Sequence, residues 1–284
     1  MNLKGRRQSS NVEDQRGNGG KIAAGGGIVG IIIAGIMLLL NGGDPTELLQ
    51  QTMNSQASPT QKYTSSPEED SLFVFASQIL ASTEDVWTAE FKKMGRTYRA
   101  PKLKIFHGSV QSGCGGATSE TGPFYCSADE CVYLDLEFFM SMKKTLGADG
   151  DFAYAYVIAH EVGHHVQHLL GTLDEAHKAM RSASKTESNQ ISVRLELQAD
   201  FYAGVWGYHE NEMFGSLEPG DIEEATGAAG KIGDDYLQKK GQGYSVPDSF
   251  THGTSAQRTK WLKKGLQTGN IKLGDTFSPS YNSL

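Results

Sequence analysis

The fold and the candidate site are decided by residues 153–171, AYAYVIAHEVGHHVQHLLG. The apolar residues of this stretch recur at helical spacing, so we predict a mostly buried helix from Phe152 to Leu170. Residues four apart on a helix lie on one face, and His160 and His164 can therefore direct imidazole nitrogens at one zinc ion. Glu161 lies beside the first histidine, where its carboxylate can accept a proton from a water molecule that zinc activates.

The same helix carries two more histidines that compete for the role of ligand. His164 and His168 are also four residues apart, whereas His165 is turned by about 100° from His164 around the helix. Only the pair His160 and His164 brackets a suitably placed glutamate. We therefore predict that His165 and His168 are packing groups near the site.

A catalytic zinc ion usually has a third protein ligand, and the segment 193–206 offers one. Glu196 and Asp200 share a helical face in this otherwise mostly apolar stretch, and burying unpaired carboxylates is costly. We predict that Glu196 binds the zinc ion and that Asp200 accepts an N–H from a ligand histidine. The alternative is that both carboxylates lie on a solvated edge of the helix.

These motifs resemble a known pattern. H-E-x-x-H followed by E-L-Q-A-D resembles the gluzincin signature of H-E-x-x-H plus E-x-x-A-D. The blocks at 114–139, 196–206 and 249–258, with a basic tail and one apolar segment before them, are similar to the neutral zinc metallopeptidase family of bacterial membrane proteins. The resemblance covers nearly the whole chain and implies the reaction class, not the target.

The predicted soluble domain, 71–284, is of the α+β class and zincin-like, with a small sheet, an active-site helix and a glutamate helix. An amphipathic helix is expected from about Leu72 to Met94, and strands at Lys102–Phe106 and Val132–Phe139. The second strand, VYLDLEFF, is a candidate edge strand that pairs with an extended substrate. The alternative is a strand buried in the sheet.

The chain before this domain suggests a membrane anchor. Residues 22–40 contain no charged side chain and can cross a hydrocarbon core of roughly 30 Å as one helix. A cleavable signal peptide competes with this interpretation. By the positive-inside rule, the basic tail at 1–21 stays in the cytoplasm. The linker at 41–70 and the catalytic domain are then periplasmic or extracellular.

Three cysteines are too few for a disulfide scaffold. Cys114 and Cys126 bracket a Gly-rich turn, and a disulfide between them would contribute ~3 kcal/mol in the chain-entropy model. Pairing of Cys126 with Cys131 is the alternative.

His252 lies in the loop F-T-H-G-T-S, just before a predicted C-terminal helix that begins near Ser255. Zinc peptidases need a donor for the oxyanion that forms as water adds to the peptide carbonyl, and we predict this role for His252. A structural hydrogen bond or a helix cap is the alternative.

The sequence thus predicts a zinc-dependent metalloendopeptidase with one zinc ion and Glu161 as general base, acting on polypeptides. A zinc-stabilised binding or scaffold protein with little turnover, and an amidase acting on cell-wall peptide, are the alternatives. The net charge of −7 argues against nucleic acid as a partner. The oligomeric state is not predicted.

Overall fold

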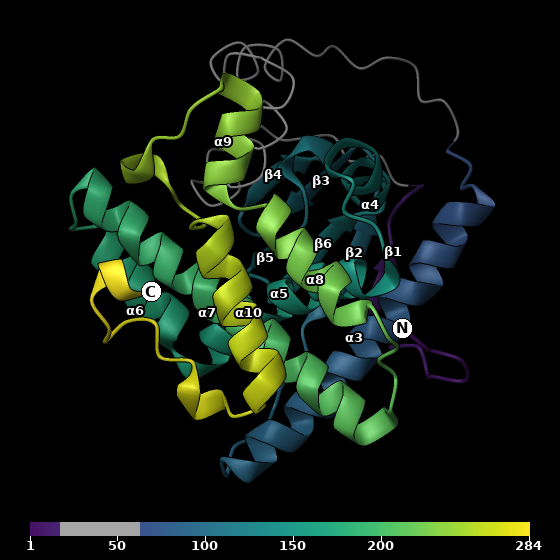
Figure 1. Cartoon of the computed structure of the whole chain (residues 1–284). Coiled ribbons are helices and arrows are strands. Elements are labelled where there is room, and N and C mark those ends of the chain that lie inside the picture. The colour runs from purple at the N-terminus through teal and green to yellow at the C-terminus, as the bar shows by residue number, and fades with distance from the viewer. Residues whose placement is uncertain (18–62) are drawn as a thin grey trace.

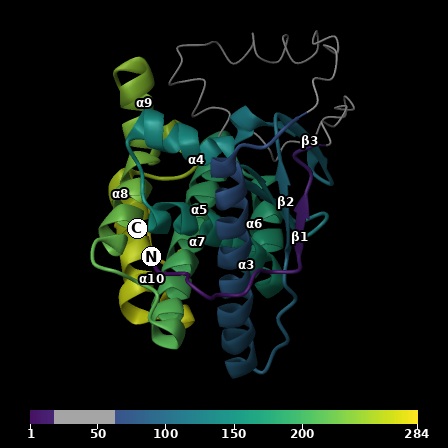
Figure 2. The same ribbon diagram turned by 90° about the vertical axis from the view of Figure 1, so that its right-hand side faces the viewer.

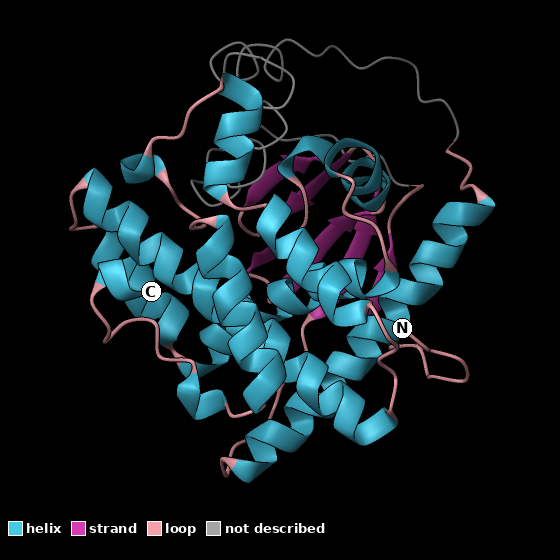
Figure 3. Cartoon of the chain, viewed as in Figure 1, coloured by secondary structure: helices cyan, strands magenta, loops and turns pink. Residues whose placement is uncertain are grey.

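The computed structural model describes residues 1–17 and 63–284 of the chain. Helices make up most of this part, and a small sheet lies at one side of them (Figure 1, Figure 3). In Figure 2 the sheet lies to the right of the long helix α3, and α8, α9 and α10 lie to its left. The predicted α+β class is confirmed.

The larger sheet is mixed and has four strands. These are β1 (Val12–Asp14), β2 (Lys102–Phe106), β6 (Cys131–Asp135) and β5 (Phe124–Cys126), in that spatial order. The pairs β1–β2 and β2–β6 are parallel, whereas β5 runs antiparallel to β6 and forms an edge of the described sheet. A separate hairpin joins β3 (Ser109–Ser112) to β4 (Gly115–Thr118).

The predicted strand Val132–Phe139 is only partly correct. Its first half is β6, which is buried along its whole length between two neighbouring strands, so it is not the edge of the sheet. The strand ends at Asp135, because the Asp135 carboxylate accepts the backbone N–H of Glu137 at 3.0 Å and turns the chain. The residues that follow form the short helix α4 (Glu137–Ser141).

Seven longer helices complete the main part of the described fold. They are α3 (Pro67–Lys93), α5 (Asp151–Leu170), α6 (Thr172–Met180), α7 (Lys185–Phe214), α8 (Asp221–Lys231), α9 (Asp234–Gln242) and α10 (Ser255–Thr268). Short helical turns lie at Ser119–Thr121, Met142–Leu146, Pro247–Ser249, Ile271–Leu273 and Tyr281–Ser283.

The ends of these helices follow from local sequence signals. Ser66 caps α3 in a capping box with Glu69, so the helix begins before the predicted Leu72. The predicted end of α5 at Leu170 is confirmed, because Gly171 adopts the left-handed conformation with φ of 86°. The predicted start of α10 near Ser255 is also confirmed, with Thr254 as its cap.

Two glycines bring α10 unusually close to α7, and the two helices lie side by side in Figure 1. A methyl group at Gly204 would clash with the carbonyl oxygen of Leu262, and one at Gly265 would clash with that of Phe201. The backbones therefore approach where both positions lack a side chain. This contact fixes the C-terminal helix on the glutamate helix.

The N-terminal segment differs from the predicted separate tail. Its strand β1 pairs with β2, and residues 1–17 pack on the same folded unit as 63–284. Arg6 lies 3.5 Å from the fully buried carboxylate of Glu210, and the Ser9 hydroxyl donates to the buried Glu84. Buried carboxylates need such partners, so this segment contributes to the domain.

The predicted membrane span at 22–40 lies outside the described residues, as does the predicted linker up to residue 62. Within 1–17 and 63–284, none of the helices combines the length and the apolar composition needed to cross a bilayer. The folded part resumes by Tyr63, whose hydroxyl donates to Glu69 at 2.5 Å, somewhat before the predicted start at 71.

Candidate metal centre

Three predicted ligands from two helices meet at one point. His160 and His164 come from α5 and Glu196 from α7, and one ligand atom of each lies within 4.8 Å of the others. His160 Nε2 is 3.1 Å from Glu196 Oε2, and His164 Nε2 is 3.4 Å from Glu196 Oε1. Both imidazoles thus direct the same kind of nitrogen at the carboxylate.

The glycine inside H-E-V-G-H explains how α7 comes so close. A methyl group on Gly163 would lie 2.9 Å from the backbone oxygen of Ala199, nearer than side chains normally allow. Gly163 is on α5 next to His164, and Ala199 is between Glu196 and Asp200 on α7. The absence of a side chain at 163 therefore lets both carboxylates reach the histidines.

The second ring nitrogen of His160 is held by a buried charged network. Its Nδ1 lies 2.8 Å from Asp200 Oδ1, which also accepts the Tyr156 hydroxyl at 2.6 Å. Arg258 of α10 binds both oxygens of Asp200 at 2.9 Å. Asp200 was predicted in this place, whereas Tyr156 and Arg258 were not predicted, because no spacing in the chain relates α10 to α7.

His164 is held differently, by a neutral amide. Its Nδ1 lies 2.9 Å from Gln167 Oε1, and the Gln167 amide nitrogen donates to the backbone oxygen of Leu195 at 2.7 Å. Gln167 lies one turn after His164 on the same helix, so an i, i+3 pattern of His and Gln was the available sequence signal.

The charges of this cluster suit a cation. Burial alone would lower the pKa of His160, but Asp200 and Glu196 outweigh it and raise that pKa to about 10. Burial likewise opposes the effect of Glu196 on His164, whose pKa is also raised. Burial would raise the pKa of Glu196, yet His164 and His160 hold it well below its usual value. Without a metal the cluster therefore favours protons on its imidazoles, where a divalent ion would replace them, and two imidazoles with a carboxylate are a donor set that zinc accepts.

Glu161 is buried beside this group, with 6% of its surface exposed. Burial raises the pKa of its carboxyl, and the neighbouring His160 and His164 oppose that rise. The backbone amide of Tyr125, on the edge strand β5, also interacts with the carboxylate. A buried carboxyl whose pKa is raised by burial is suited to act as a general base.

His252 lies at the border of the site with one nitrogen free. Its Nδ1 is 3.0 Å from Asp234 Oδ1, whereas its buried Nε2 has no hydrogen-bond partner among the described residues. Among the groups that hold the pKa of Glu196 below its usual value, His252 follows His164 and His160. The next residue, Gly253, has φ of +93° and packs on Val193 of α7.

Asp234 holds the loop that carries His252. Its Oδ2 accepts three consecutive backbone N–H groups, those of Thr251 at 2.8 Å, His252 at 2.7 Å and Gly253 at 3.0 Å. This residue could not be predicted from the sequence, since nothing in the pattern of α9 marks its first position as more than a helix start.

The two remaining histidines of α5 lie away from the three ligands. His165 is fully buried, with Nδ1 at 2.9 Å from the Tyr125 hydroxyl and Nε2 at 2.6 Å from the Arg99 backbone oxygen. His168 lies 3.6 Å from Glu130 near the surface. Neither set of contacts includes His160, His164 or Glu196.

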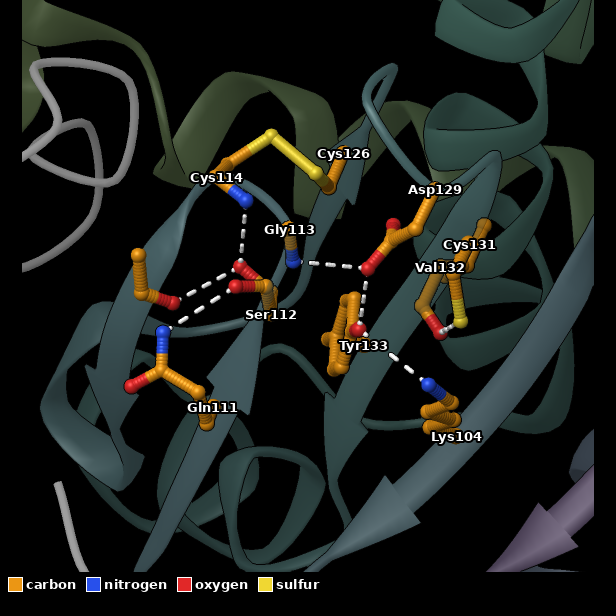
Figure 4. Close-up of a disulfide and its surroundings, with 11 residues drawn as sticks. Lys104, Gln111, Ser112, Gly113, Cys114, Cys126, Asp129, Cys131, Val132 and Tyr133 are labelled. Atoms are coloured by element: carbon orange, nitrogen blue, oxygen red, sulfur yellow. Dashed lines mark hydrogen bonds between the residues drawn. A yellow bond between two sulfur atoms is a disulfide. The ribbon is translucent and has the colours of Figure 1, made fainter. Parts of the chain in front are cut away.

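The cysteines pair in the first of the two predicted ways. Cys114 and Cys126 form a disulfide, and Cys131 is free and buried on the neighbouring strand (Figure 4). Burial raises the pKa of the Cys131 thiol to about 12, so this group is an unreactive part of the core.

A second group of metal-compatible side chains, His107, Asp135 and Glu137, lies at the carboxyl ends of β2 and β6. Asp135 is already occupied by the backbone N–H of Gly108 at 3.0 Å and by that of Glu137. Glu137 is exposed. The local loop structure therefore accounts for this group without an ion.

The family described as "Putative neutral zinc metallopeptidase" matches residues 1–277. This chain belongs to that family. "Uncharacterized protein YpfJ" of Escherichia coli K12 is 49% identical over 289 residues, covering 99% of this chain and 100% of the relative. "Uncharacterized protein Mb2605" of Mycobacterium bovis and "Uncharacterized protein Rv2575" of Mycobacterium tuberculosis are each 43% identical over 207 residues, covering 69% of this chain and 68% of the relative.

No solved structure shows significant similarity to the chain. Membership of the metallopeptidase family supports zinc as the metal and a polypeptide as the substrate at the level of the family. The match begins at residue 1, so it includes the N-terminal segment that packs on the domain.

Proposed function

We propose that this chain is a zinc-dependent metalloendopeptidase in which His160, His164 and Glu196 hold one zinc ion and Glu161 is the general base. The observation that supports this proposal best is the convergence of the three donor groups from α5 and α7, with a buried carboxylate beside them. Zinc, when bound there, would supply Lewis-acid polarisation of the scissile carbonyl.

The other groups fit the remaining steps of peptide hydrolysis. Glu161 accepts a proton from the attacking water and returns it to the amine that leaves. As an imidazolium whose Nδ1–H donates to Asp234, His252 would present its Nε2–H to the developing oxyanion. The edge strand β5, whose Tyr125 amide interacts with Glu161, can pair with an extended substrate.

The test compares the full-length wild type with Glu161→Gln, because residues 1–17 belong to the fold. We expect wild type to bind one zinc ion per chain and to hydrolyse an unfolded protein substrate. Glu161→Gln should retain zinc and lose about 10²- to 10⁴-fold in kcat. Equal turnover by the two proteins would remove Glu161 from the mechanism.

The same comparison separates the alternatives. A zinc-stabilised binding protein has no use for a buried carboxylate beside the ion. Such a protein would show no turnover, and Glu161→Gln could change only its binding. An amidase of cell-wall peptide would use the same groups, so cell-wall fragments are assayed beside unfolded protein. Preferential hydrolysis of the fragments would change the substrate class and leave the metal centre in place.

A further inference from the structure

We infer that Arg258 is a positioning residue of the metal centre, which fixes the Asp200 carboxylate so that His160 presents Nε2 to the ion. This inference rests on the metal site of the proposed function. It concerns a residue of α10, a helix that contributes none of the three ligands.

Arg258 binds Asp200 as a planar fork. Its Nε donates to Oδ2 and its Nη2 to Oδ1, both at 2.9 Å. Nη1 donates to the backbone oxygen of Ile232 at 3.2 Å, so the guanidinium is itself held in place. Arg258 is 3% exposed and Asp200 is fully buried, and water therefore does not compete for these bonds. Such bidentate pairs fix geometry as well as charge.

The fork determines what Asp200 can do for His160. A carboxylate gripped at both oxygens cannot rotate about its terminal bond, so Oδ1 stays directed at His160 Nδ1, 2.8 Å away. An imidazole that donates from Nδ1 keeps Nε2 as the unprotonated nitrogen that a metal requires. Arg258 also balances the charge of Asp200, which would otherwise be buried without a permanent counter-ion.

The packing of α10 on α7 sets the position of Arg258. The close approach at Gly204 and Gly265 fixes the two helices where Arg258 lies within reach of Asp200. The loop that carries His252 leads directly into the same helix through its cap, Thr254. The short segment 249–258 therefore supplies both His252 and Arg258 to the site. This gives a physical reason for the sequence pattern of the segment.

The test measures zinc affinity by competition with a chelator, and records the absorption spectrum of the Co²⁺-substituted protein. Arg258→Gln should weaken zinc binding by about 10- to 100-fold, as is typical for partners of metal ligands. Arg258→Lys keeps the charge without the fork, and we expect an intermediate loss with an altered Co²⁺ spectrum. Arg194→Lys is the control, since Arg194 also links α7 to the C-terminal region, through the backbone oxygens of Thr276 and Phe277, without contacting Asp200.

A double variant shows whether Arg258 acts through Asp200. Arg258→Gln in an Asp200→Asn background should weaken zinc binding no further than Asp200→Asn alone. Losses that multiply in the double variant, or wild-type affinity and an unchanged Co²⁺ spectrum in folded Arg258→Gln, would overturn the inference. If Arg258→Gln does not fold, Arg258→Lys decides by the same criteria. Failure of the wild type to bind zinc would instead refute the proposed function.

Discussion

His160 and His164 each use one ring nitrogen to contact the protein and direct the other toward Glu196. Their partners differ in charge, because His160 contacts the carboxylate of Asp200 and His164 contacts the amide of Gln167. A carboxylate makes the imidazole a stronger donor than an amide does. The two candidate ligands are therefore not equivalent, and the His160 side of the site depends on residues from a third helix.

His252 gives a prediction at the scale of a single residue. His252→Ala should lower kcat by about 10²- to 10³-fold, the usual effect of losing one oxyanion donor, and leave zinc content unchanged. Asp234→Asn should act in the same direction by a smaller factor, since it loosens the histidine without removing it. Steady-state kinetics with a peptide substrate, beside zinc analysis of each variant, provide the measurement. Wild-type turnover by His252→Ala would assign the residue to structure alone.

Among the elements, the contact between α5 and α7 depends on a position where helix propensity and packing oppose each other. Alanine is favoured over glycine inside a helix by up to about 1 kcal/mol. At Gly163, however, the added methyl group would push against the backbone of Ala199. We predict that Gly163→Ala destabilises the protein by about 1 to 3 kcal/mol, as overpacking does, and weakens zinc binding.

Gly227 offers the matched control for this prediction. It also lies inside a helix, α8, and a methyl group there would meet no atom within 4 Å. Gly227→Ala should therefore be neutral or raise the free energy of unfolding by about 0.5 to 1 kcal/mol. Denaturant unfolding of both variants is the measurement. A neutral Gly163→Ala with full zinc affinity would show that the helices do not need this close approach.

Features that depend on local sequence signals could be predicted, whereas contacts between distant segments could not. The helices α3, α5 and α10 could be found because periodicity and caps are local signals. The proposed ligand set could be predicted because His160 and His164 are four residues apart on one helix, and because Glu196 is a carboxylate in an otherwise mostly apolar stretch. The edge strand β5 was missed because three residues in a Gly-rich stretch give no periodicity. Arg258 was missed because only the packing of α10 on α7 brings it to the site.

On the scale of the whole molecule, the N-terminal segment is the largest departure from the sequence analysis. The strand β1, Val12–Asp14, is too short and too charged to be recognised, and its partner β2 lies far along the chain. Lys102 pairs with Glu13 at 2.8 Å, and Arg16 pairs with Asp70 at 3.1 Å. These contacts tie the segment before residue 18 to the domain after residue 62.

This packing constrains how the chain can sit at a membrane. A single crossing by residues 22–40 would place 1–17 and 63–284 on opposite sides, and β1 could not then pair with β2. We therefore predict that both described parts lie on the same side of any membrane that the protein contacts. The predicted cytoplasmic tail and the predicted exported domain would then exclude each other.

Cysteine labelling tests this prediction in intact cells. Lys4 and Lys272 are exposed and belong to the two described parts, so each is changed singly to cysteine in the full chain. Background is low, because Cys131 is buried and the other two cysteines form a disulfide. A membrane-impermeant maleimide should label both variants or neither, and both should react after permeabilisation. Labelling of Lys272→Cys alone in intact cells would show that a membrane separates the two parts, and that β1 does not pair with β2 in the cell.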